Sequence, residues 1–171
     1  VPSVKNTATP QYVAGKDNGS AVKFGTGSIL EVTDNAGIMG AGFRELCVSF
    51  DVNLDEDVIS GTQVLLRNGH QKVPFNIFLQ TSNVMGVILQ GEDATFSSTI
   101  KTARSALSTS AGWQNVMVVW NGSSLSIYID GKAQTLNVGG TAAKLPGLSS
   151  LIKADAPMGI GGLRRVDKST G

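Results

Sequence analysis

Hydrophobic and polar residues alternate along much of this 171-residue chain, which is the pattern of strands that bury one face. In residues 124–136, SLSIYIDGKAQTL, three apolar residues fall on one side of an extended chain, and two serines and a tyrosine fall on the other. Only Asp130 and Gly131 separate this run from the next one. Asp-Gly is favoured where both central residues of a turn need positive φ, so the segment predicts a β-hairpin with a type I′ turn.

Similar short runs recur along the chain, separated by clusters of Gly, Ser, Thr and Asn. Strands are predicted at 20–26, 28–34, 45–54, 62–69, 75–82, 84–91, 95–103, 113–121, 124–129 and 132–138. Two further stretches, KTARSALSTSAG and LPGLSSLIKAD, can form either a short helical turn or an irregular loop. Closely spaced strands without intervening helices predict an all-β fold of two packed antiparallel sheets, a β-sandwich or jelly roll.

The strands on either side of the NGSS turn predict the centre of the core. Apolar residues there keep a period of two, which sends them to one face of the sheet. The residues expected in one core are Trp113, Val116, Val118, Leu125, Ile127 and Ile129.

Length and charge narrow the classes of function. A chain of this length favours one domain. Its 14 Lys and Arg residues nearly balance 13 Asp and Glu residues, so it lacks the positive field that gathers nucleic acid or anionic lipid. No stretch approaches the roughly 20 apolar residues that cross a bilayer. We therefore expect no nucleic-acid partner and no membrane insertion. The single cysteine, Cys47, cannot form an internal disulfide and is expected to be a small buried hydrophobe.

The run GWQNVMVVWNGSSLSIYIDGK, residues 112–132, resembles the signature of the laminin-G-like, concanavalin A-like lectin/glucanase superfamily. Upstream, GSAVKFGTGSILEVTD resembles the first hairpin of that superfamily, and ELCVSFDVNLDEDVISGTQVLLRNG resembles its next two strands. Downstream, MGIGGL resembles the Ile-Gly-Gly that ends the penultimate strand. The resemblance implies a concanavalin A-like sandwich over 19–163, with 1–18 as an N-terminal extension or strand and 164–171 as a tail.

The resembled superfamily has one more strand after the Ile-Gly-Gly, and this strand closes a sheet. Here LRRVDKSTG follows, in which Leu163 and Val166 are the only large apolar residues. An unfilled central position would leave backbone N–H and C=O groups unpaired. We therefore expect that the 171 residues are part of a longer polypeptide, or that VPSVKNTATPQYVA or a neighbouring subunit fills the position.

The sequence disfavours catalysis. Glucanases of the resembled superfamily place carboxylates two residues apart on one strand, where they share acid and nucleophile work. The nearest group here is 55–57 in NLDEDVISG, which lies where a strand gives way to a loop. His70 is the only histidine and lies in a polar turn, which disfavours both a Ser-His-Asp arrangement and a zinc site. We expect that the protein is not an enzyme.

Oxygen-rich loops suit calcium better than any other metal. The candidate ligands are Asp17 in GKDNG, Asp34 in TDNAG and Asp55 in the acidic loop. Such Asp-Asn-Gly sequences are also common turn formers, so both readings stay open. If a metal binds, we expect calcium at one of these three residues.

The two tryptophans are candidates for ligand contact because aromatic faces stack on sugar rings. In the resembled superfamily the residue matching Trp113 mostly packs in the core. Trp120 is followed by Asn121 near a predicted strand end and could reach a rim. Trp120 and Asn121 are therefore the predicted ligand-binding residues.

Two functions fit these observations. The first is a non-catalytic, lectin-like recognition module, either carbohydrate-binding or adhesive, that binds a glycan or a surface protein. The second is a structural or decoration domain of a viral or bacterial surface assembly, which packs against copies of itself or other subunits. The resemblance implies an extracellular, cell-surface or virion-surface location for either one.

Overall fold

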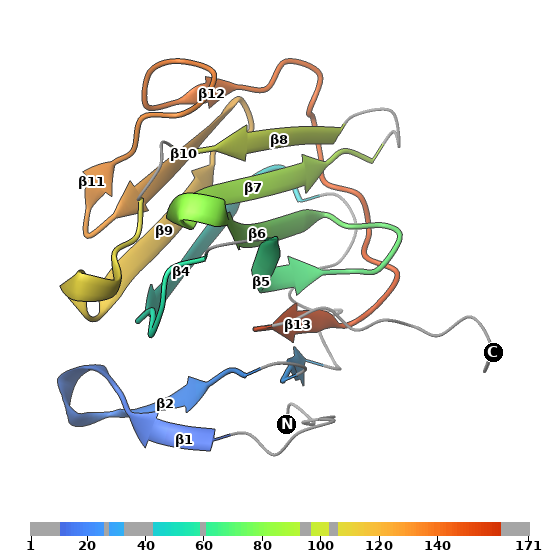
Figure 1. The fold of residues 1–171 in the computed structure, drawn as a ribbon. Coiled ribbons are helices and arrows are strands. Elements are labelled where there is room, and N and C mark those ends of the chain that lie inside the picture. Colours follow the sequence, from blue (N-terminus) through green and yellow to red (C-terminus); the bar gives the residue numbers. More distant parts are fainter. Residues whose placement is uncertain are drawn as a thin grey trace.

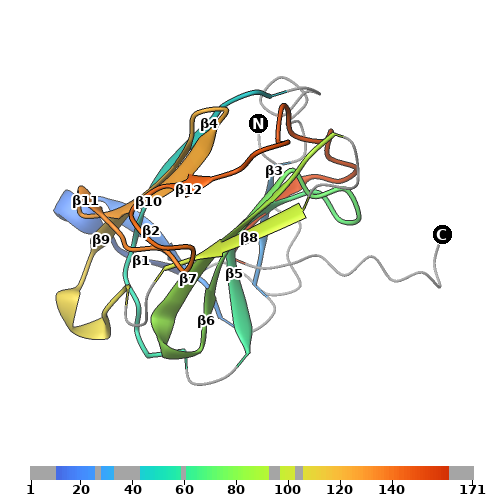
Figure 2. The same cartoon turned by 90° about the horizontal axis from the view of Figure 1, so that it is seen from above.

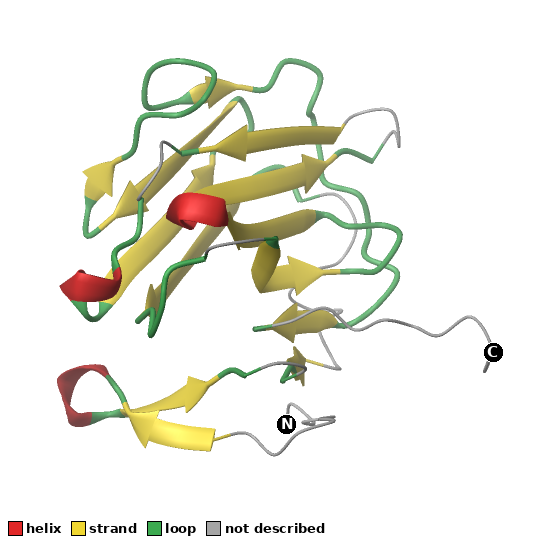
Figure 3. Cartoon of the chain, viewed as in Figure 1, coloured by secondary structure: helices red, strands yellow, loops and turns green. Residues whose placement is uncertain are grey.

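The computed structural model describes residues 11–25, 28–32, 43–58, 61–92, 97–102 and 106–161. These residues form strands and three short 3-10 turns (Figures 1 and 3). Every strand pairing among them is antiparallel. The paired strands form two main sheets and one separate hairpin. The prediction of an all-β antiparallel sandwich is confirmed. Within the described part of the chain, no helix has the length and apolar character needed to cross a bilayer.

The larger sheet has six strands in the order β3-β13-β5-β6-β7-β8. Their bounds are β3 Leu30–Val32, β13 Met158–Ile160, β5 Thr62–Asn68, β6 Phe75–Gln80, β7 Val84–Gln90 and β8 Ser97–Lys101. Strands β5 to β8 follow one another along the chain as a meander, whereas β13 returns from the other end of the sequence to pair with β5.

The second sheet has five strands, with β11, β10, β9 and β4 in that order and β12 also paired to β10. Their bounds are β4 Leu46–Val52, β9 Gln114–Trp120, β10 Ser124–Ile129, β11 Lys132–Ala133 and β12 Ala143–Lys144. A separate hairpin joins β1 (Gln11–Ala14) to β2 (Ser20–Lys23), with the 3-10 turn η1 (Lys16–Asn18) between them. Figure 2 shows the two main sheets as separate layers.

The Asp-Gly turn has the predicted backbone conformation, because Asp130 and Gly131 have φ values of 49° and 74°. The strand before it matches its predicted bounds, but the strand after it ends at Ala133 and not at residue 138. Beyond β11 the chain leaves the sheet, and Leu136 forms a bridge with Thr102 at the end of β8. This crossing closes one side of the sandwich.

The core lies between the two main sheets. Val116, Val118, Leu125 and Ile127 are fully buried there, as predicted. Ile129, also predicted, is buried in the same cluster. Trp113 is different: it is half-buried and stands outside the buried cluster. It precedes β9 and is out of phase with the even-numbered residues that face the core.

The stretch 145–155 is an irregular loop that nevertheless contributes to the core. Its buried residues are Leu145, Leu148, Leu151 and Ile152. The Leu151 N–H donates to the carbonyl of Phe43, which ties the loop to the segment before β4. The spacing of apolar residues in 145–155 is therefore compatible with a helix, but here these residues are buried from an irregular loop.

Cys47 corrects one expectation. It lies on the outer face of β4 and is exposed, because alternation along this strand sends its even-numbered neighbours to the core. Strand β1 falls within 1–18. Leu163 and Val166 lie outside the described residues.

Candidate functional site

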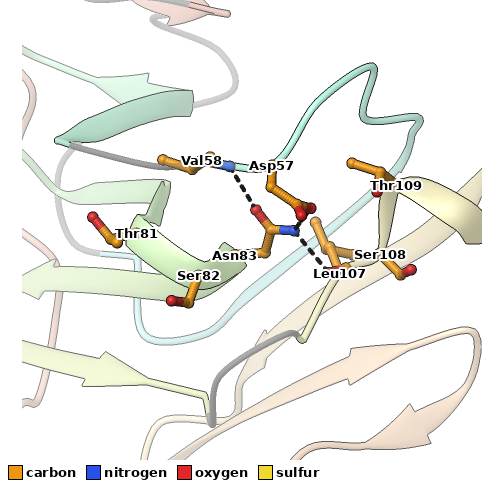
Figure 4. A pocket seen from close by; sticks show the side chains of 8 residues that line it. All are labelled: Asp57, Val58, Thr81, Ser82, Asn83, Leu107, Ser108 and Thr109. Atoms are coloured by element: carbon orange, nitrogen blue, oxygen red, sulfur yellow. Dashed lines mark hydrogen bonds between the residues drawn. The ribbon is translucent and has the colours of Figure 1, made fainter.

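Three segments that are distant in sequence line an open hollow of about 490 Å³ (Figure 4). They are the loop after β4, the turn between β6 and β7, and the segment before β9. The lining residues are Asp57, Val58, Thr81, Ser82, Asn83, Leu107, Ser108 and Thr109. We call this the rim hollow.

Asn83 holds the three segments of the rim hollow together. Its Oδ1 accepts a hydrogen bond from the Val58 N–H at 2.9 Å. Its Nδ2 donates to Asp57 Oδ1 at 2.7 Å and to the Leu107 carbonyl at 3.2 Å. The Asn83 side chain is buried, and each of its two polar atoms is used. One side chain thus sets the shape of the site (Figure 4).

The turn that carries Asn83 has an unusual backbone. Ser82 and Asn83 have φ values of 64° and 51°, in the left-handed region. Asn enters this region more readily than most residues, and serine does so at a cost of about 1–2 kcal/mol. The three hydrogen bonds of Asn83 offset that cost.

The segment before β9 is fixed by its own hydrogen bonds. The Ser108 N–H donates to Gln114 Oε1 at 2.8 Å, and the Ser108 Oγ accepts from the Ser110 N–H at 3.3 Å. This caps the 3-10 turn η3, Thr109–Ala111. Leu107 is fully buried in the core, so apolar packing also holds this segment in place.

The chemistry of the rim hollow suits binding of a hydroxyl-rich molecule. Four described lining residues, Thr81, Ser82, Ser108 and Thr109, carry hydroxyl groups, which both donate and accept hydrogen bonds. Asp57 adds a carboxylate. Among the described lining residues it is the single titratable group, so they offer no pair of acid and base for catalysis.

The structure places Trp120 and Asn121 away from the rim hollow. Gln114, at the start of β9, contacts the site through Ser108, whereas Trp120 ends the same strand. The Trp120 side chain is 0% exposed and lies in the core, so a sugar cannot reach its ring in this conformation. Asn121 is exposed, but its Oδ1 accepts from the N–H groups of Ser123 and Ser124 and shapes the turn.

The predicted calcium ligands are not brought together. Asp17 is exposed in the turn η1, with φ at 53°. Asp55 Oδ2 lies 2.6 Å from Lys23 Nζ in an exposed ion pair. Asp34 lies outside the described residues. Over the ranges that the structure describes, no three His, Cys, Asp or Glu side chains gather as metal ligands do. Calcium binding stays a prediction.

Sequence reasoning missed most of the rim hollow. Asp57 belongs to the acidic group 55–57, in which the sequence predicts a calcium ligand only at Asp55. Thr81, Ser82 and Asn83 look like any polar turn between two strands. The informative signal is the burial of Asn83, which depends on contacts with residues 24 to 26 positions away.

No family model matches this chain, and no curated protein matches it. Solved structures share its fold. The binding domain of botulinum neurotoxin serotype G superposes with a TM-score of 0.69 at 9% identity, covering 97% of this chain and 40% of that one. The serotype C1 binding domain gives 0.65 at 13% identity, covering 99% and 41%. The serotype D binding domain gives 0.63 at 16% identity, covering 97% and 43%.

The chain thus spans less than half the length of the binding domains that it matches. Identities this low show a shared fold alone. The comparisons establish that the β-rich architecture of this chain also occurs within binding domains of these toxins.

Proposed function

We propose that this chain is a non-catalytic, lectin-like recognition module that binds carbohydrate at the rim hollow. The observation that carries the proposal is the hydrogen bonding of buried Asn83, which holds hydroxyl-bearing residues of separate segments around one hollow. A binding site that is formed before the ligand arrives loses less entropy on binding. An extracellular or cell-surface location would suit this role.

Two structures that share the fold support a glycan as the ligand. One is a structure of botulinum neurotoxin type C, a toxin that depends for cell entry upon interaction with two ganglioside molecules. The other is the binding domain of botulinum neurotoxin DC in complex with SialylT. Because this chain covers only 40% and 38% of those two chains, glycan binding here is an inference from fold and site together.

The charge of the rim hollow limits the class of sugar that it would bind. Its single charged group among the described lining residues is the Asp57 carboxylate, which would repel the carboxylate of a sialylated glycan. We therefore propose neutral or amino sugars as the preferred class. Their hydroxyl or ammonium groups can donate to Asp57 while the threonine and serine hydroxyls of the site complete the contacts.

A glycan array screened with and without calcium tests this function. The site variants are Asp57→Asn, which removes the charge, and Thr81→Val, which removes a hydroxyl group at nearly constant shape. The matched control is Thr135→Val, an exposed threonine outside the site. We expect each site variant to lose about tenfold in glycan affinity, as for one lost hydrogen bond of about 1.4 kcal/mol, and the control to behave as wild type.

Two results would count against this function. Unchanged glycan binding by both site variants would move the binding site elsewhere on the protein. Binding that disappears with a chelator would instead favour the calcium loops that contain Asp17 or Asp55.

A structural or decoration role in a surface assembly is the second candidate. The observation that favours it is that, among the residues the structure describes, one edge of β4 has no paired strand and its apolar residues are only partly covered.

A further inference from the structure

The tripeptide Asn-Gly-Ser occurs at two places in this chain, 18–20 and 121–123. Asn followed by any residue except proline and then by Ser or Thr is the acceptor sequence for N-linked glycosylation. A tripeptide also recurs by chance, so the surroundings of each copy decide whether it can act as an acceptor.

The copy at 121–123 lies in the turn between β9 and β10. Asn121 and Ser123 are both exposed. Gly122 between them has φ at 84°, in the left-handed region that glycine adopts without strain. The Asn121 N–H donates to the Ser124 carbonyl at 3.1 Å and closes the turn. An enzyme can therefore approach this tripeptide from solvent.

The Asn121 side chain is held in place through its oxygen. Asn121 Oδ1 accepts from the Ser123 N–H at 3.1 Å and from the Ser123 Oγ at 3.0 Å. It also accepts from the Ser124 N–H at 2.9 Å and from the Ser124 Oγ at 3.3 Å. This arrangement is an Asx turn. Asn121 Nδ2 makes no hydrogen bond to a described residue, so the nitrogen that would carry a sugar stays available.

The hydrogen bonds to Oδ1 favour reaction at Nδ2. An amide nitrogen is a poor nucleophile because its lone pair is delocalised onto the oxygen. When Nδ2 gives up a proton, negative charge develops on the amide and is shared with Oδ1. Donors at Oδ1 stabilise that charged form. One of these donors is the hydroxyl of Ser123, the group that the acceptor sequence requires at this position.

The Asx turn is also local. Its hydrogen bonds join Asn121 to residues only two or three positions away. They can therefore form before β9 and β10 pair with the rest of the sheet. The hydrogen bonds of Asn83, by contrast, span 24 to 26 positions and need the complete fold. The geometry at Asn121 is thus available to an enzyme that acts during synthesis.

The copy at 18–20 lacks this arrangement. Asn18 and Ser20 are exposed, but no hydrogen bond joins their side chains in the part of the chain that the structure describes. Asn18 has φ at 61° and ends the 3-10 turn η1. The Gly19 N–H donates to the Lys16 carbonyl at 2.9 Å. This exposed copy is therefore an internal comparison for the one at Asn121.

A glycan attached to Asn121 would leave the rim hollow open. The rim hollow lies near the start of β9, where Gln114 contacts Ser108, whereas Asn121 follows the end of that strand. A strand as long as β9 separates its two ends by about 20 Å. Figure 1 shows the turn η3 and the β9–β10 turn at opposite ends of β9.

We propose that Asn121 is an N-glycosylation site, modified when the chain passes through a secretory compartment that holds an oligosaccharyl transferase. The donor is an oligosaccharide linked to a polyprenyl diphosphate. A bond forms from Nδ2 to the anomeric carbon, and the bond from that carbon to the diphosphate oxygen breaks. The diphosphate leaves with the electron pair, and the Nδ2 proton passes to a base of the transferase. The proposal rests on the proposed extracellular location and not on glycan binding at the rim hollow.

Secretion of the intact 171-residue chain from a eukaryotic cell line, behind a cleavable leader, tests the proposal. An amidase that cleaves N-linked glycans leaves aspartate at the modified position, and mass spectrometry of the peptide identifies it. Cleavage in heavy-oxygen water separates this aspartate from one that forms by spontaneous deamidation. We expect labelled aspartate at position 121 in most of the secreted chains.

Three variants separate the acceptor chemistry from the stability of the turn. Asn121→Asp keeps an oxygen acceptor for the turn but lacks the nitrogen, so modification should disappear. Ser123→Ala removes the hydroxyl of the acceptor sequence and should lower the modified fraction at least about tenfold. The matched control Ser124→Ala removes a hydroxyl that also contacts Oδ1 but lies outside the tripeptide, so modification should continue. Melting temperatures of the secreted variants verify that each one folds.

Three outcomes would overturn the proposal. An unmodified Asn121 in folded, secreted wild-type protein would mean that this turn is not an acceptor. Modification of Asn18 alone would mean that the Asx turn gives no advantage. Equal losses in Ser123→Ala and Ser124→Ala would mean that the stability of the turn, and not the acceptor hydroxyl, decides the result. Glycan-array binding tests the proposed function separately from all three.

Discussion

The ring of Phe78 on β6 lies directly against Gly86, its cross-strand partner on β7. A Cβ atom added at Gly86 would collide with three atoms of that ring. Phe78 is itself 3% exposed, so the ring has little room to move aside. Position 86 therefore requires glycine because of its neighbour, and its own φ is not in the left-handed region.

Replacing Gly86 with alanine should lower the free energy of unfolding by about 1–3 kcal/mol, the usual cost of overpacking. Urea unfolding measures this loss. The same change in a Phe78→Ala background should cost much less, because the ring is gone. Gly131→Ala is the contrast: a Cβ there meets nothing within 4 Å, and its cost of about 1–2 kcal/mol comes from φ at 74° alone. Equal costs for Gly86→Ala with and without Phe78 would refute the steric account.

Removing the Asn83 side chain should destabilise the protein and open the rim hollow. Asn83→Ala leaves the Val58 N–H buried without its acceptor, at about 1–3 kcal/mol, and adds the strain of alanine at positive φ. Asn83→Gly removes the same hydrogen bonds without the strain, so it should be the more stable variant by about 1 kcal/mol. Thermal unfolding of both variants measures the two contributions, and glycan affinity should fall in both. The reverse order of stability would show that the backbone conformation is not strained.

Asp155 should make stability depend on pH in the acidic range. Burial by itself would raise the pKa of Asp155, but the N–H groups of His70, Lys72 and Gln71 bond to the carboxylate, and together they lower the pKa below its ordinary value. A lowered folded-state pKa stabilises the protein above the unfolded value near 3.8, and this stabilisation disappears as the pH falls through the folded value.

Asp155→Asn should therefore be less stable than wild type at pH 7, by roughly 1 kcal/mol after allowance for solvent screening. The difference should start to shrink as the pH falls below the unfolded value of 3.8 and should disappear below the lower folded pKa, where the native carboxylate is also protonated. Urea unfolding at pH 7, 5 and 3 measures it. A difference that stays constant over this range would contradict the role of the charge. Asp51 also has a lowered pKa, from its bond to Lys16, but it is unchanged in both proteins under comparison.

Trp120 should matter for stability and not for ligand contact. Trp120→Ala should cost about 3–5 kcal/mol, as large core truncations do. Trp120→Phe should cost less, because the indole N–H is buried without a hydrogen-bond partner among the described residues and its removal loses none. Folded Trp120→Phe protein should bind glycan as wild type does on the array. A folded variant that fails to bind would restore this residue as a ligand contact.

Alternation along the chain predicted much of the fold, because strands such as β4, β9 and β10 bury one face with a period of two. The hairpin around Asp130 is the clearest case. Alternation did not predict that β6 is buried on both faces, or that the register between β5 and β6 shifts between Val64 and Leu66. The same period explains the failure at the tryptophans: Trp120 is in phase with Val118 and points inward, while Trp113 is out of phase and lies before the strand. The period of two by itself places Trp120 in the core and Trp113 outside it, the reverse of the roles expected for these residues.

The candidate site could not be predicted in this way. The role of Asn83 depends on its hydrogen bonds to the loop after β4 and to the segment before β9. These contacts form only in the folded protein, and no local sequence pattern predicts them. The acidic residues near Asp55 have the carboxylates that suit a cation, yet Asp55 is paired with Lys23. An ion pair between two loops depends on the fold, whereas the alternation of apolar and polar residues depends only on neighbours in sequence.

The pairing of β4 with β9 has a consequence for how the protein is made. These strands are adjacent in the sheet, but 68 positions separate Val52 from Trp120 in the sequence. At a synthesis rate of about 5–20 residues per second, β4 leaves the ribosome roughly 3–14 seconds before β9 is complete. Strands β5 to β8 can pair with one another during that interval. We expect β4 to wait with both edges open, which makes it the segment of the nascent chain most exposed to chaperones and to misassociation.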